Sequence, residues 1–309
     1  MNLNQLTGTW ELTTWRQPES EREYPFGSDP VGYLTYHPES GYVALQAMKS
    51  GRPHVSVAHD NYLWMSPEDK AVAAEAFFGY VGQYTFQGDT VIHKPEVAFN
   101  PNWVGRPQAY RCHLAEETLT LSTADGKLQT IWQRAKPLES RQQIVPHNDL
   151  VGIWKLVSIY TSMDGFLSRL LWIIFDRESS LLTKLKDKPV MYPHGQNARG
   201  YIMYNEQGYM SAHVMNANRP HLVTADDIFQ ASVQEKAQAT HTYLSYAGPY
   251  TIQADQVIHQ PTLSLFPNFV GTDLVRIIKL TDTQLTLSTR PVKAMGVLVT
   301  AVIVWERLT

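Results

Sequence analysis

Short segments in which apolar and polar residues alternate recur along the whole chain, with glycine-containing turns between them. This alternation is typical of β-strands, because successive side chains of a strand point to opposite faces of a sheet. The clearest such segments are residues 43–47, 84–86, 119–121 and 302–305. The pattern therefore predicts a chain built mostly of short antiparallel strands.

Two segments break this pattern and predict helices. Ser66 is a suitable N-cap for the first helix, Pro67 suits the first helical position, and an alanine-rich run follows at 71–76. The second helix is expected to begin after Thr224 and to run to about Thr240. Each helix leads directly into a segment of the form Tyr-x-Gly-x-Tyr, which is predicted to be the next strand.

The sequence of the first half recurs in the second half, in the same order. The matching pairs of segments are 6–12 with 150–156, 32–36 with 200–204, 52–54 with 219–221, 80–84 with 246–250, 91–95 with 257–261, 101–105 with 267–271, and 119–123 with 285–289. So many collinear matches predict two copies of one fold, at about 1–140 and 147–309.

The second copy carries an insertion. The offset between equivalent positions is 144 residues at Trp10 and Trp154, and it rises to 168 at Gly32 and Gly200. The extra residues fall around 164–191, and the middle of this stretch is strongly apolar. A lid, a contact in a homodimer and the seam between the two copies are three interpretations that the sequence leaves open.

A copy of about 140 residues with many short strands and one helix suggests a closed barrel, because closure removes the exposed edges of a single sheet. We therefore expect an all-β protein of two tandem antiparallel barrels, each with one short helix. A barrel of about eight strands is wide enough to hold one small ligand.

Composition narrows the choice of partners and location. The 309 residues carry a formal net charge of −3, which offers no basic excess for binding a nucleic acid. A single cysteine, Cys112, excludes a disulfide framework. No apolar run reaches the ~18 residues that would span a bilayer, and the first residues lack a signal-peptide pattern. Stable membrane insertion is therefore not expected, and a cytoplasmic location is.

Two motifs resemble those of known barrels. Gly8-Thr9-Trp10 and Gly152-Ile153-Trp154 resemble the first-strand signature of lipocalins and other calycins, which pair this tryptophan with an arginine on the last strand. Arg134 and Arg307 hold the matching places. The resemblance implies that both pairs are structural and that the guanidinium stacks on the indole.

The inner motifs resemble the bacterial lipocalin-like domain family, which carries Tyr-Ala-Gly-x-Tyr, Val-x-His and Pro-Asn-Trp/Phe-x-Gly segments followed by an arginine. The second copy matches all of these, and its arginine is Arg276. The first copy departs, because Tyr110 takes the place of Arg276 and Arg111 lies one position later. Arg111 would face inward only if a bulge intervenes, and His113 shares its face. The resemblance implies the fold rather than an activity, since related barrels include binders and enzymes.

The polar residues that recur in both copies suit proton transfer on a carbonyl compound. His93 or His259 would be the acid or base, and Tyr84 or Tyr250 would donate a hydrogen bond to a developing oxyanion. An arginine can hold a substrate carboxylate with two hydrogen bonds. The residues expected to bind the substrate are Tyr80, Trp103, Arg111 and His113 in the first copy, and Tyr246, Asn268, Phe269 and Arg276 in the second.

Each of these features also has a purely structural interpretation. The two histidines can bond to backbone at a barrel rim, and the Pro-Asn segments at 101–102 and 267–268 can form turns. The Arg-Pro-His segments at 52–54 and 219–221 fit a shared turn as well as a site at the barrel mouth. The charged side chains within 94–96 fit a solvated pair on the outer face.

The sequence contains no phosphate-binding loop, nucleophile elbow or metal-ligand motif, so neither a cofactor nor a metal is expected. We expect a cofactor-independent cyclase or isomerase of natural-product biosynthesis. Its substrate would be a hydrophobic, aromatic carbonyl compound or an indole-type β-keto acid, which could lose its carboxylate. The alternatives are a non-catalytic carrier of a hydrophobic small molecule and a structural protein with filled barrels.

Overall fold

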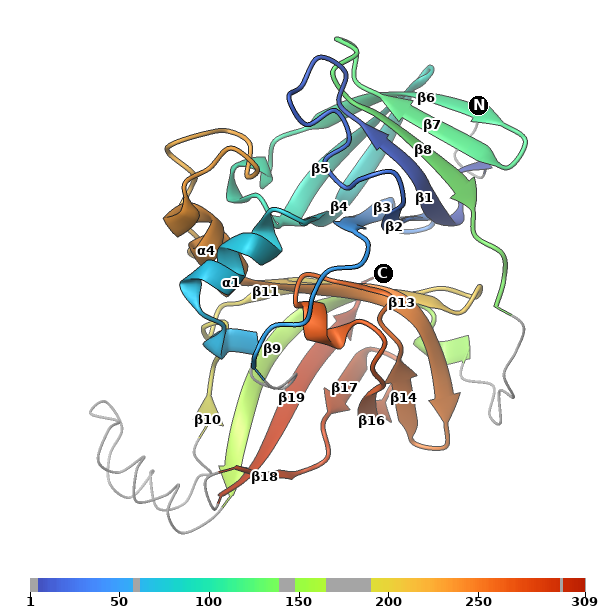
Figure 1. Cartoon of the computed structure of the whole chain (residues 1–309). Coiled ribbons are helices and arrows are strands. Elements are labelled where there is room, and N and C mark those ends of the chain that lie inside the picture. The colour runs from blue at the N-terminus through green and yellow to red at the C-terminus, as the bar shows by residue number, and fades with distance from the viewer. Residues whose placement is uncertain (1–4, 58–61, 139–147, 165–189, 295–296, 309) are drawn as a thin grey trace.

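The computed structural model describes residues 5–57, 62–138, 148–164, 190–294 and 297–308 (Figure 1). In these ranges the chain folds into two closed antiparallel barrels of eight strands, stacked one above the other, with two short helices beside the seam. This confirms the all-β class and the tandem barrels predicted from the repeat. The insertion expected around 164–191 lies almost wholly outside the described residues.

The first barrel closes through the pairing of its last strand with its first. Around the barrel its strands follow chain order: β1 (Gly8–Arg16), β2 (Pro30–His37), β3 (Tyr42–Lys49), β4 (Phe77–Gln87), β5 (Thr90–Ala98), β6 (Gln108–Ala115), β7 (Thr118–Ser122) and β8 (Gln129–Arg134). Between β3 and β4 the chain forms helix α1 (Pro67–Ala74), preceded by the short 3₁₀ helix η2 (Tyr62–Trp64). The Asp69 N–H donates to Ser66 Oγ at 3.0 Å, so Ser66 caps α1 as the sequence predicts.

The second barrel repeats this order and closes through the pairing of β19 with β9. Its eight strands are β9 (Gly152–Asp164), β11 (Arg199–Tyr204), β12 (Tyr209–Met215), β13 (Tyr243–Gln253), β14 (Gln256–His259), β16 (Leu274–Leu280), β17 (Gln284–Ser288) and β19 (Val297–Arg307). Three short strands pair with strands of this barrel: β10 (Val190–Met191) with β9, β15 (Leu263–Ser264) with β13, and β18 (Val292–Ala294) with β19.

The second helix, α4 (Val233–His241), begins later than the sequence predicts. Ser232 is its N-cap and forms a capping box with Glu235, in which each side chain accepts from the backbone N–H of the other residue. Thr224 donates its hydroxyl to the Glu235 carboxylate instead of capping a helix. The expected start after Thr224 is therefore wrong, because the Ser-x-x-Glu signature provides the stronger cap.

One end of each barrel is closed by a tryptophan. The indole of Trp10 donates to the Leu6 carbonyl at 2.9 Å, and the guanidinium of Arg134 lies 4.1 Å from the centre of the ring. In the second barrel Arg307 lies at the same distance, 4.1 Å, above Trp154. These geometries confirm the stacked pairs that the calycin resemblance implies.

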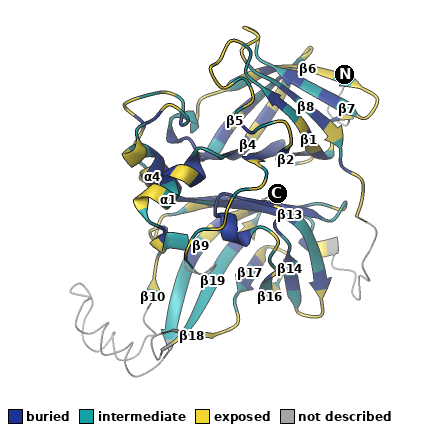
Figure 2. Ribbon diagram, in the orientation of Figure 1, coloured by how far each residue is buried: buried dark blue, intermediate teal, exposed yellow. Residues whose placement is uncertain are grey.

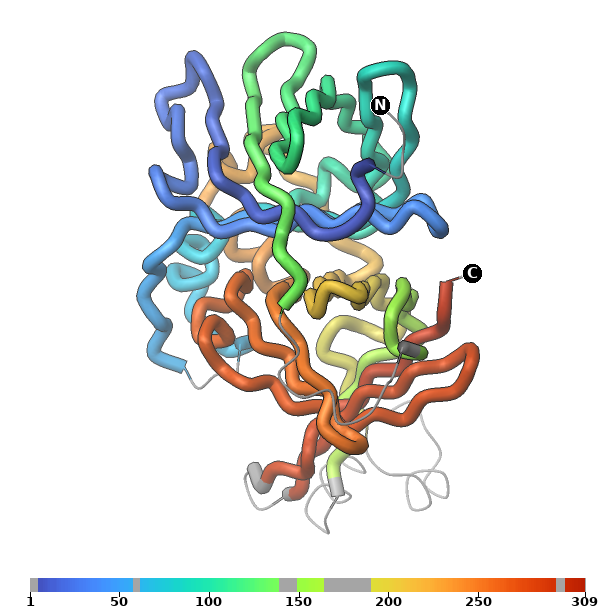
Figure 3. The backbone as a smooth tube through the Cα atoms, turned by 90° about the vertical axis from the view of Figure 1, so that its right-hand side faces the viewer, coloured from blue at the N-terminus to red at the C-terminus, as the bar shows by residue number. Residues whose placement is uncertain are grey.

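The seam between the barrels is tightly bonded. Helices α1 and α4 lie side by side across it (Figure 1), and Lys236 Nζ reaches Glu75 Oε1 at 2.8 Å. Gln46 of β3 is fully buried and donates to Ser211 Oγ of the second barrel at 2.8 Å. After β8 the chain crosses from one barrel to the other along the outside of the seam (Figure 3), where the Leu138 N–H donates to the Gln207 carbonyl at 3.0 Å.

Each domain also extends a loop over the other. The described residues 50–57 and 62–66, between β3 and α1, lie against the second barrel, and the chain at 216–232, between β12 and α4, runs beside the first (Figure 1). Their contacts are reciprocal, because the two loops hold equivalent places in the repeat. The two barrels are therefore held together by an exchange of segments rather than by flat packing alone.

The arginine of each Arg-Pro-His segment makes the main contact of this exchange. Arg52 donates to the Ser264 and Leu265 carbonyls of the second barrel at 2.7 and 2.8 Å. Arg219 donates in the same way to backbone carbonyls of the first barrel, among them that of Phe99 at 2.7 Å. These segments therefore join the domains, which is neither of the two roles that the sequence suggests for them.

The asparagine of each Pro-Asn segment completes the contact. Asn268, in the 3₁₀ helix η5 (Pro267–Phe269), accepts from the Val55 N–H at 2.8 Å. Asn102, in η3 (Pro101–Trp103), accepts from the Leu222 N–H, also at 2.8 Å. Both segments do form turns, as one interpretation of the sequence holds, but their amides serve the opposite domain.

Candidate functional site

A histidine held between two tyrosines lies inside the second barrel. The Nε2 atom of His259 is 2.7 Å from the Tyr204 hydroxyl, and its Nδ1 atom is 3.1 Å from the Tyr246 hydroxyl. His259 is fully buried, and this desolvation, aided by the positive charge of Arg276, holds its pKa well below the ordinary value. The imidazole is therefore neutral at neutral pH.

The first barrel contains the same arrangement. The Nε2 atom of His93 is 2.8 Å from the Tyr36 hydroxyl, and its Nδ1 atom is 2.6 Å from the Tyr80 hydroxyl. Burial lowers the pKa of His93 to about 3. Neither histidine lies at a barrel rim, so the structural interpretation that placed them there is wrong.

In both barrels the two ring nitrogens already have partners. A neutral imidazole donates from one nitrogen and accepts at the other, so one phenol of each pair donates and the other accepts. Tyr36 and Tyr204 were not among the sequence-predicted site residues. The repeated Gly-Tyr-x-x-Tyr segments at 32–36 and 200–204 contained the signal that could have found them. This bonding positions the phenols and leaves the histidines poor bases.

Tyr84 and Tyr250, the expected oxyanion donors, pack against the tyrosines that bind the histidines. Tyr84 packs edge-on against Tyr36 with ring centres 4.9 Å apart, and Tyr250 packs against Tyr204 at 5.0 Å. The Tyr250 hydroxyl donates to the Asn205 carbonyl at 3.0 Å. Burial raises the pKa of each of the two phenols to about 12, so both are neutral donors.

The two barrels differ in how far their interiors are filled. Four inward-facing positions, on the same face as the histidine, are buried in the first barrel, with exposed fractions of 3–7%, and only half-buried in the second. In the order first barrel, second barrel, they are Phe78 and Leu244, Tyr110 and Arg276, Cys112 and Ile278, and Thr130 and Ile303. Residues 299–304 of β19, which include Ile303, are all intermediate and are drawn so in Figure 2. An inward side chain with accessible surface indicates that the interior of the second barrel is more open than that of the first.

Arg276 is the charged group of this open interior. Its positive charge lies close enough to oppose the effect of burial, which raises the pKa of Tyr204 and Tyr246. It donates to the Val275 carbonyl at 2.9 Å, and no carboxylate among the described residues pairs with it. A guanidinium in this setting favours an anionic or strongly accepting oxygen of a ligand.

Arg111 and His113 do not join the interior of the first barrel. Both are exposed on the outer face of β6, whereas Tyr110 and Cys112 point inward. No bulge is present between β5 and β6, where Thr90 pairs with Arg111. The expectation that a bulge would turn these two side chains inward is therefore wrong, and Tyr110 takes the place of Arg276.

The remaining predicted binding residues lie on β4 and β13 and in the 3₁₀ helices η3 and η5. Tyr80 and Tyr246 bind the histidines, as described above. Trp103 packs on Phe78 with ring centres 4.9 Å apart, and Phe269 packs on Tyr246 at 5.9 Å. Asn268 is occupied by the exchanged loop of the first domain. Whether any of these residues touches a substrate stays a prediction.

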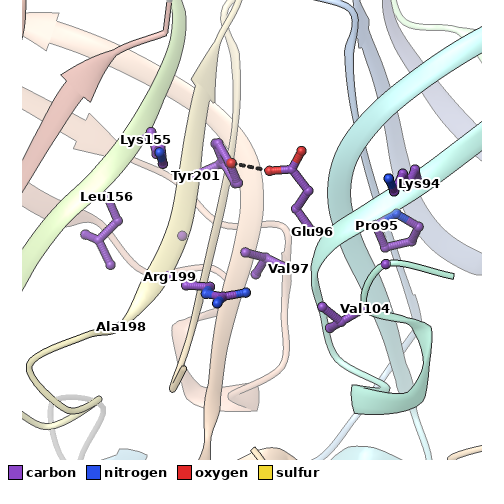
Figure 4. Close-up of a pocket in the computed structure, with 12 residues that line it drawn as sticks. Lys94, Pro95, Glu96, Val97, Val104, Lys155, Leu156, Ala198, Arg199 and Tyr201 are labelled. Atoms are coloured by element: carbon purple, nitrogen blue, oxygen red, sulfur yellow. Dashed lines mark hydrogen bonds between the residues drawn. The ribbon is translucent and has the colours of Figure 1, made fainter. Parts of the chain in front are cut away.

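The charged side chains within 94–96 are not a solvated pair. Glu96 accepts from Tyr201 of the second barrel (Figure 4). It also accepts from Tyr42 at 3.2 Å. The carboxylate lines a cleft of about 460 Å³ at the seam, together with Lys94 and Arg199. Glu96 therefore links the two barrels on the outer side of both interiors.

The described residues contain no group of three or more histidine, cysteine, aspartate or glutamate side chains placed to hold a metal ion. No helix in the same ranges is long and apolar enough to cross a membrane.

The fold defines a class of closed antiparallel β-barrel, and comparison with known sequences gives the family. The lipocalin-like domain family matches residues 7–139 and 179–308, so the chain belongs to this family. A similar curated protein is the 4'-hydroxy-3'-methoxypropiophenone carrier protein ppsC of Aspergillus oryzae. It is 29% identical over 108 residues, which make up 32% of this chain and 96% of that protein.

Two crystal structures also share similarity with the chain. An uncharacterized protein from Bacteroides eggerthii is 10% identical, with 42% of this chain and 99% of that chain covered, at a TM-score of 0.25. A protein of unknown function from Nostoc punctiforme is 10% identical, with 99% of this chain and 97% of that chain covered, at a TM-score of 0.23. At these TM-scores neither likeness supports an argument.

Proposed function

We propose that this protein binds and carries a small aromatic molecule inside its second barrel. The observation that supports the proposal best is the half-buried Arg276 on the inner face of β16, beside neutral phenols and apolar side chains. An apolar wall with a few aimed polar groups is the usual form of a small-molecule site. The similarity to a carrier of an aromatic ketone fits the same chemistry.

The polar end of the ligand would face Arg276. A guanidinium can donate two hydrogen bonds to a carboxylate, or to the oxygens of an acidic phenol or an aromatic ketone. Tyr204 and Tyr246 add neutral hydroxyls whose positions are set by His259. The aromatic body of the ligand would pack against apolar side chains such as Ile278 and Leu244.

Calorimetric titration tests this proposal with 4'-hydroxy-3'-methoxypropiophenone and with the carboxylate 4-hydroxy-3-methoxybenzoate as probes. Arg276→Leu should weaken binding by ~10-fold or more, because a hydrogen bond to a charged group contributes about 1.5–3 kcal/mol. Arg111→Leu is the matched control, since that guanidinium is exposed outside the first barrel. If neither aromatic probe binds, nor an apolar dye, the proposal is wrong.

Catalysis is the second candidate, and the chain from Arg276 through Tyr246 and His259 to Tyr204 is the observation that favours it. The tandem arrangement also resembles that of the cyanobacterial scytonemin-pathway cyclase, which acts on an indole-containing β-keto acid. This candidate is the weaker one, because both ring nitrogens of His259 already have hydrogen-bond partners and its low pKa makes the imidazole a poor base. Turnover of such a β-keto acid by the wild type, lost ~100-fold in His259→Ala with binding retained, would establish it.

A further inference from the structure

The mouth of each barrel is covered by an aromatic residue of the other domain. Tyr62 of the first domain lies on η2 and packs against Phe269 of the second barrel, with ring centres 6.2 Å apart. Phe229 of the second domain packs against Phe26 of the first barrel at 5.7 Å. Tyr62 and Phe229 lie in equivalent segments of the repeat, each shortly before the serine that caps the following helix. The exchange therefore gives the two mouths different covers.

The mouth of the first barrel is filled by a continuous series of rings. Phe26 meets Trp15 at 5.2 Å, and Trp15 meets Phe78 at 5.3 Å. Phe78 in turn packs on Trp103 at 4.9 Å. Phe26, Trp15 and Phe78 are at most 5% exposed, so this series together with Phe229 forms an aromatic plug.

The mouth of the second barrel carries polar groups beside its aromatic rings. The Tyr62 hydroxyl is 2.8 Å from His194 Nε2, and the two rings are stacked with centres 6.0 Å apart. Ile159 and Leu244 stand where the first barrel has Trp15 and Phe78.

The hydrogen bonds of His194 fix the direction of this contact. Its Nδ1 atom is 3.1 Å from the side-chain oxygen of Asn216, to which it donates. The Nε2 atom must then accept, so the Tyr62 hydroxyl is the donor and its oxygen keeps a free lone pair. Tyr62 is thereby held in one place above the barrel.

Tyr62 also lies near the proposed anchor of the ligand. Phe269 bridges the Tyr62 and Tyr246 rings, with centres 6.2 and 5.9 Å away. The charge of Arg276 acts on Tyr62 directly, because it opposes the burial that raises the pKa of this phenol. The same wall therefore carries Arg276, Tyr246 and a side chain from the other domain.

We propose that the ligand site is shared between the domains, with Tyr62 of the first domain forming part of the wall of the second barrel. Each chain then binds one aromatic ligand, and the first barrel binds none. The inference rests on the proposed function and goes further, since it limits ligand binding to the second barrel and has the first domain contribute Tyr62 to that site. The ligand ring packs against Tyr62 and Phe269, with its anionic or phenolic oxygen toward Arg276.

Titration of the full chain with 4-hydroxy-3-methoxybenzoate and with 4'-hydroxy-3'-methoxypropiophenone gives the first test. One ligand per chain is expected for whichever probe binds. Two ligands of similar affinity per chain would overturn the inference and leave the proposed function standing. If the wild type binds neither probe nor an apolar dye, both the inference and the proposed function are overturned.

Matched substitutions at the two covers give the second test. Tyr62→Leu should weaken binding by ~10-fold or more, because it removes a fixed aromatic wall, and Tyr62→Phe should show the share of the hydroxyl alone. Phe229→Leu makes the comparable change at the plugged barrel and should leave affinity within ~2-fold. Thermal melting of each variant checks that it folds. Unchanged affinity in folded Tyr62→Leu and Tyr62→Phe, with loss in Arg276→Leu, would overturn only the shared site.

Discussion

Arg52 and Arg219 make the same contact in opposite directions across the seam. Each lies in a loop that leaves its own barrel, and each donates to two consecutive backbone carbonyls of the other barrel. Burial lowers the pKa of each guanidinium to about 10, which leaves both charged at neutral pH. A charge buried among carbonyls is stable only while those carbonyls stay in place, so the pair ties the two domains into one unit.

Removal of either arginine should therefore destabilise the whole chain. Arg52→Ala or Arg219→Ala leaves two buried carbonyls without a donor, at a cost of about 2 kcal/mol or more in the free energy of unfolding. Urea unfolding followed by tryptophan fluorescence measures this. The exposed Arg22→Ala is the control and should stay within ~0.5 kcal/mol of the wild type. An equally small change in either seam variant would show that the contact is not important for stability.

Filling the second barrel should weaken binding without unfolding the protein. Leu244→Phe introduces the residue that the first barrel has at the equivalent position, where Phe78 is buried. We expect affinity for an aromatic probe to fall by ~10-fold or more, because the ring occupies the space that the ligand needs. Titration calorimetry and a melting curve test both parts of this prediction.

The reverse substitution in the first barrel is its control. Phe78→Leu should lower stability through a cavity, by about 1–3 kcal/mol, and leave affinity unchanged. If Phe78→Leu lowers the affinity as much as Leu244→Phe does, the ligand does not bind specifically in the second barrel.

Stability should fall as the pH is lowered, because several histidines are buried in the neutral form. Burial lowers the pKa of His93 and His213 to about 3 and that of His194 to about 4. In an unfolded chain histidine titrates near 6.5. Between these values the unfolded state binds more protons, so the free energy of unfolding is largest above pH ~7 and declines as the pH falls through 6.5 toward 4.

Urea unfolding at about pH 7.5, 6 and 5 measures this decline. His213→Gln removes one of the groups and should make the dependence on pH shallower. His54→Gln alters an exposed histidine and should leave the slope as it is. Equal slopes in the wild type and His213→Gln would show that His213 does not contribute.

The capping box of α4 should contribute to the stability of the whole chain. Ser232→Ala removes the side chain that accepts from the Glu235 N–H, so a loss of about 1 kcal/mol is expected. Because α4 packs on α1 across the seam, the loss should appear in the unfolding of the whole chain. Ser66→Ala, at the cap of α1, provides a matched comparison. A change below ~0.3 kcal/mol in Ser232→Ala would contradict the assignment.

Much of the fold could be predicted from the sequence because the duplication makes every signal appear twice. The Gly-x-Trp segments and the distant arginines define the closed ends, and the Tyr-x-Gly-x-Tyr segments lie in strands as predicted. The start of α4 was missed because Thr224 and Ser232 are both acceptable caps, and only the partner Glu235 distinguishes them. Local pattern alone cannot rank two such caps.

The site was harder to predict, because its parts come from different strands and from both domains. Alternation correctly places His93 and His259 inside, but it does not show that Tyr36 and Tyr204 bind them across the barrel. The outward position of Arg111 follows from the register of β6, which depends on whether a bulge is present. Contacts between the copies leave no periodic trace in a sequence, so the roles of the exchanged loops could be found only in three dimensions.

The reciprocal pairing of Arg52 with one barrel and Arg219 with the other has the form of an isologous contact, in which one surface meets a copy of itself. Such a contact would join two identical subunits as a twofold dimer. When both subunits lie on a single polypeptide, their sequences can diverge. One barrel can then become a filled structural domain, while the other keeps an open interior and evolves a new specificity.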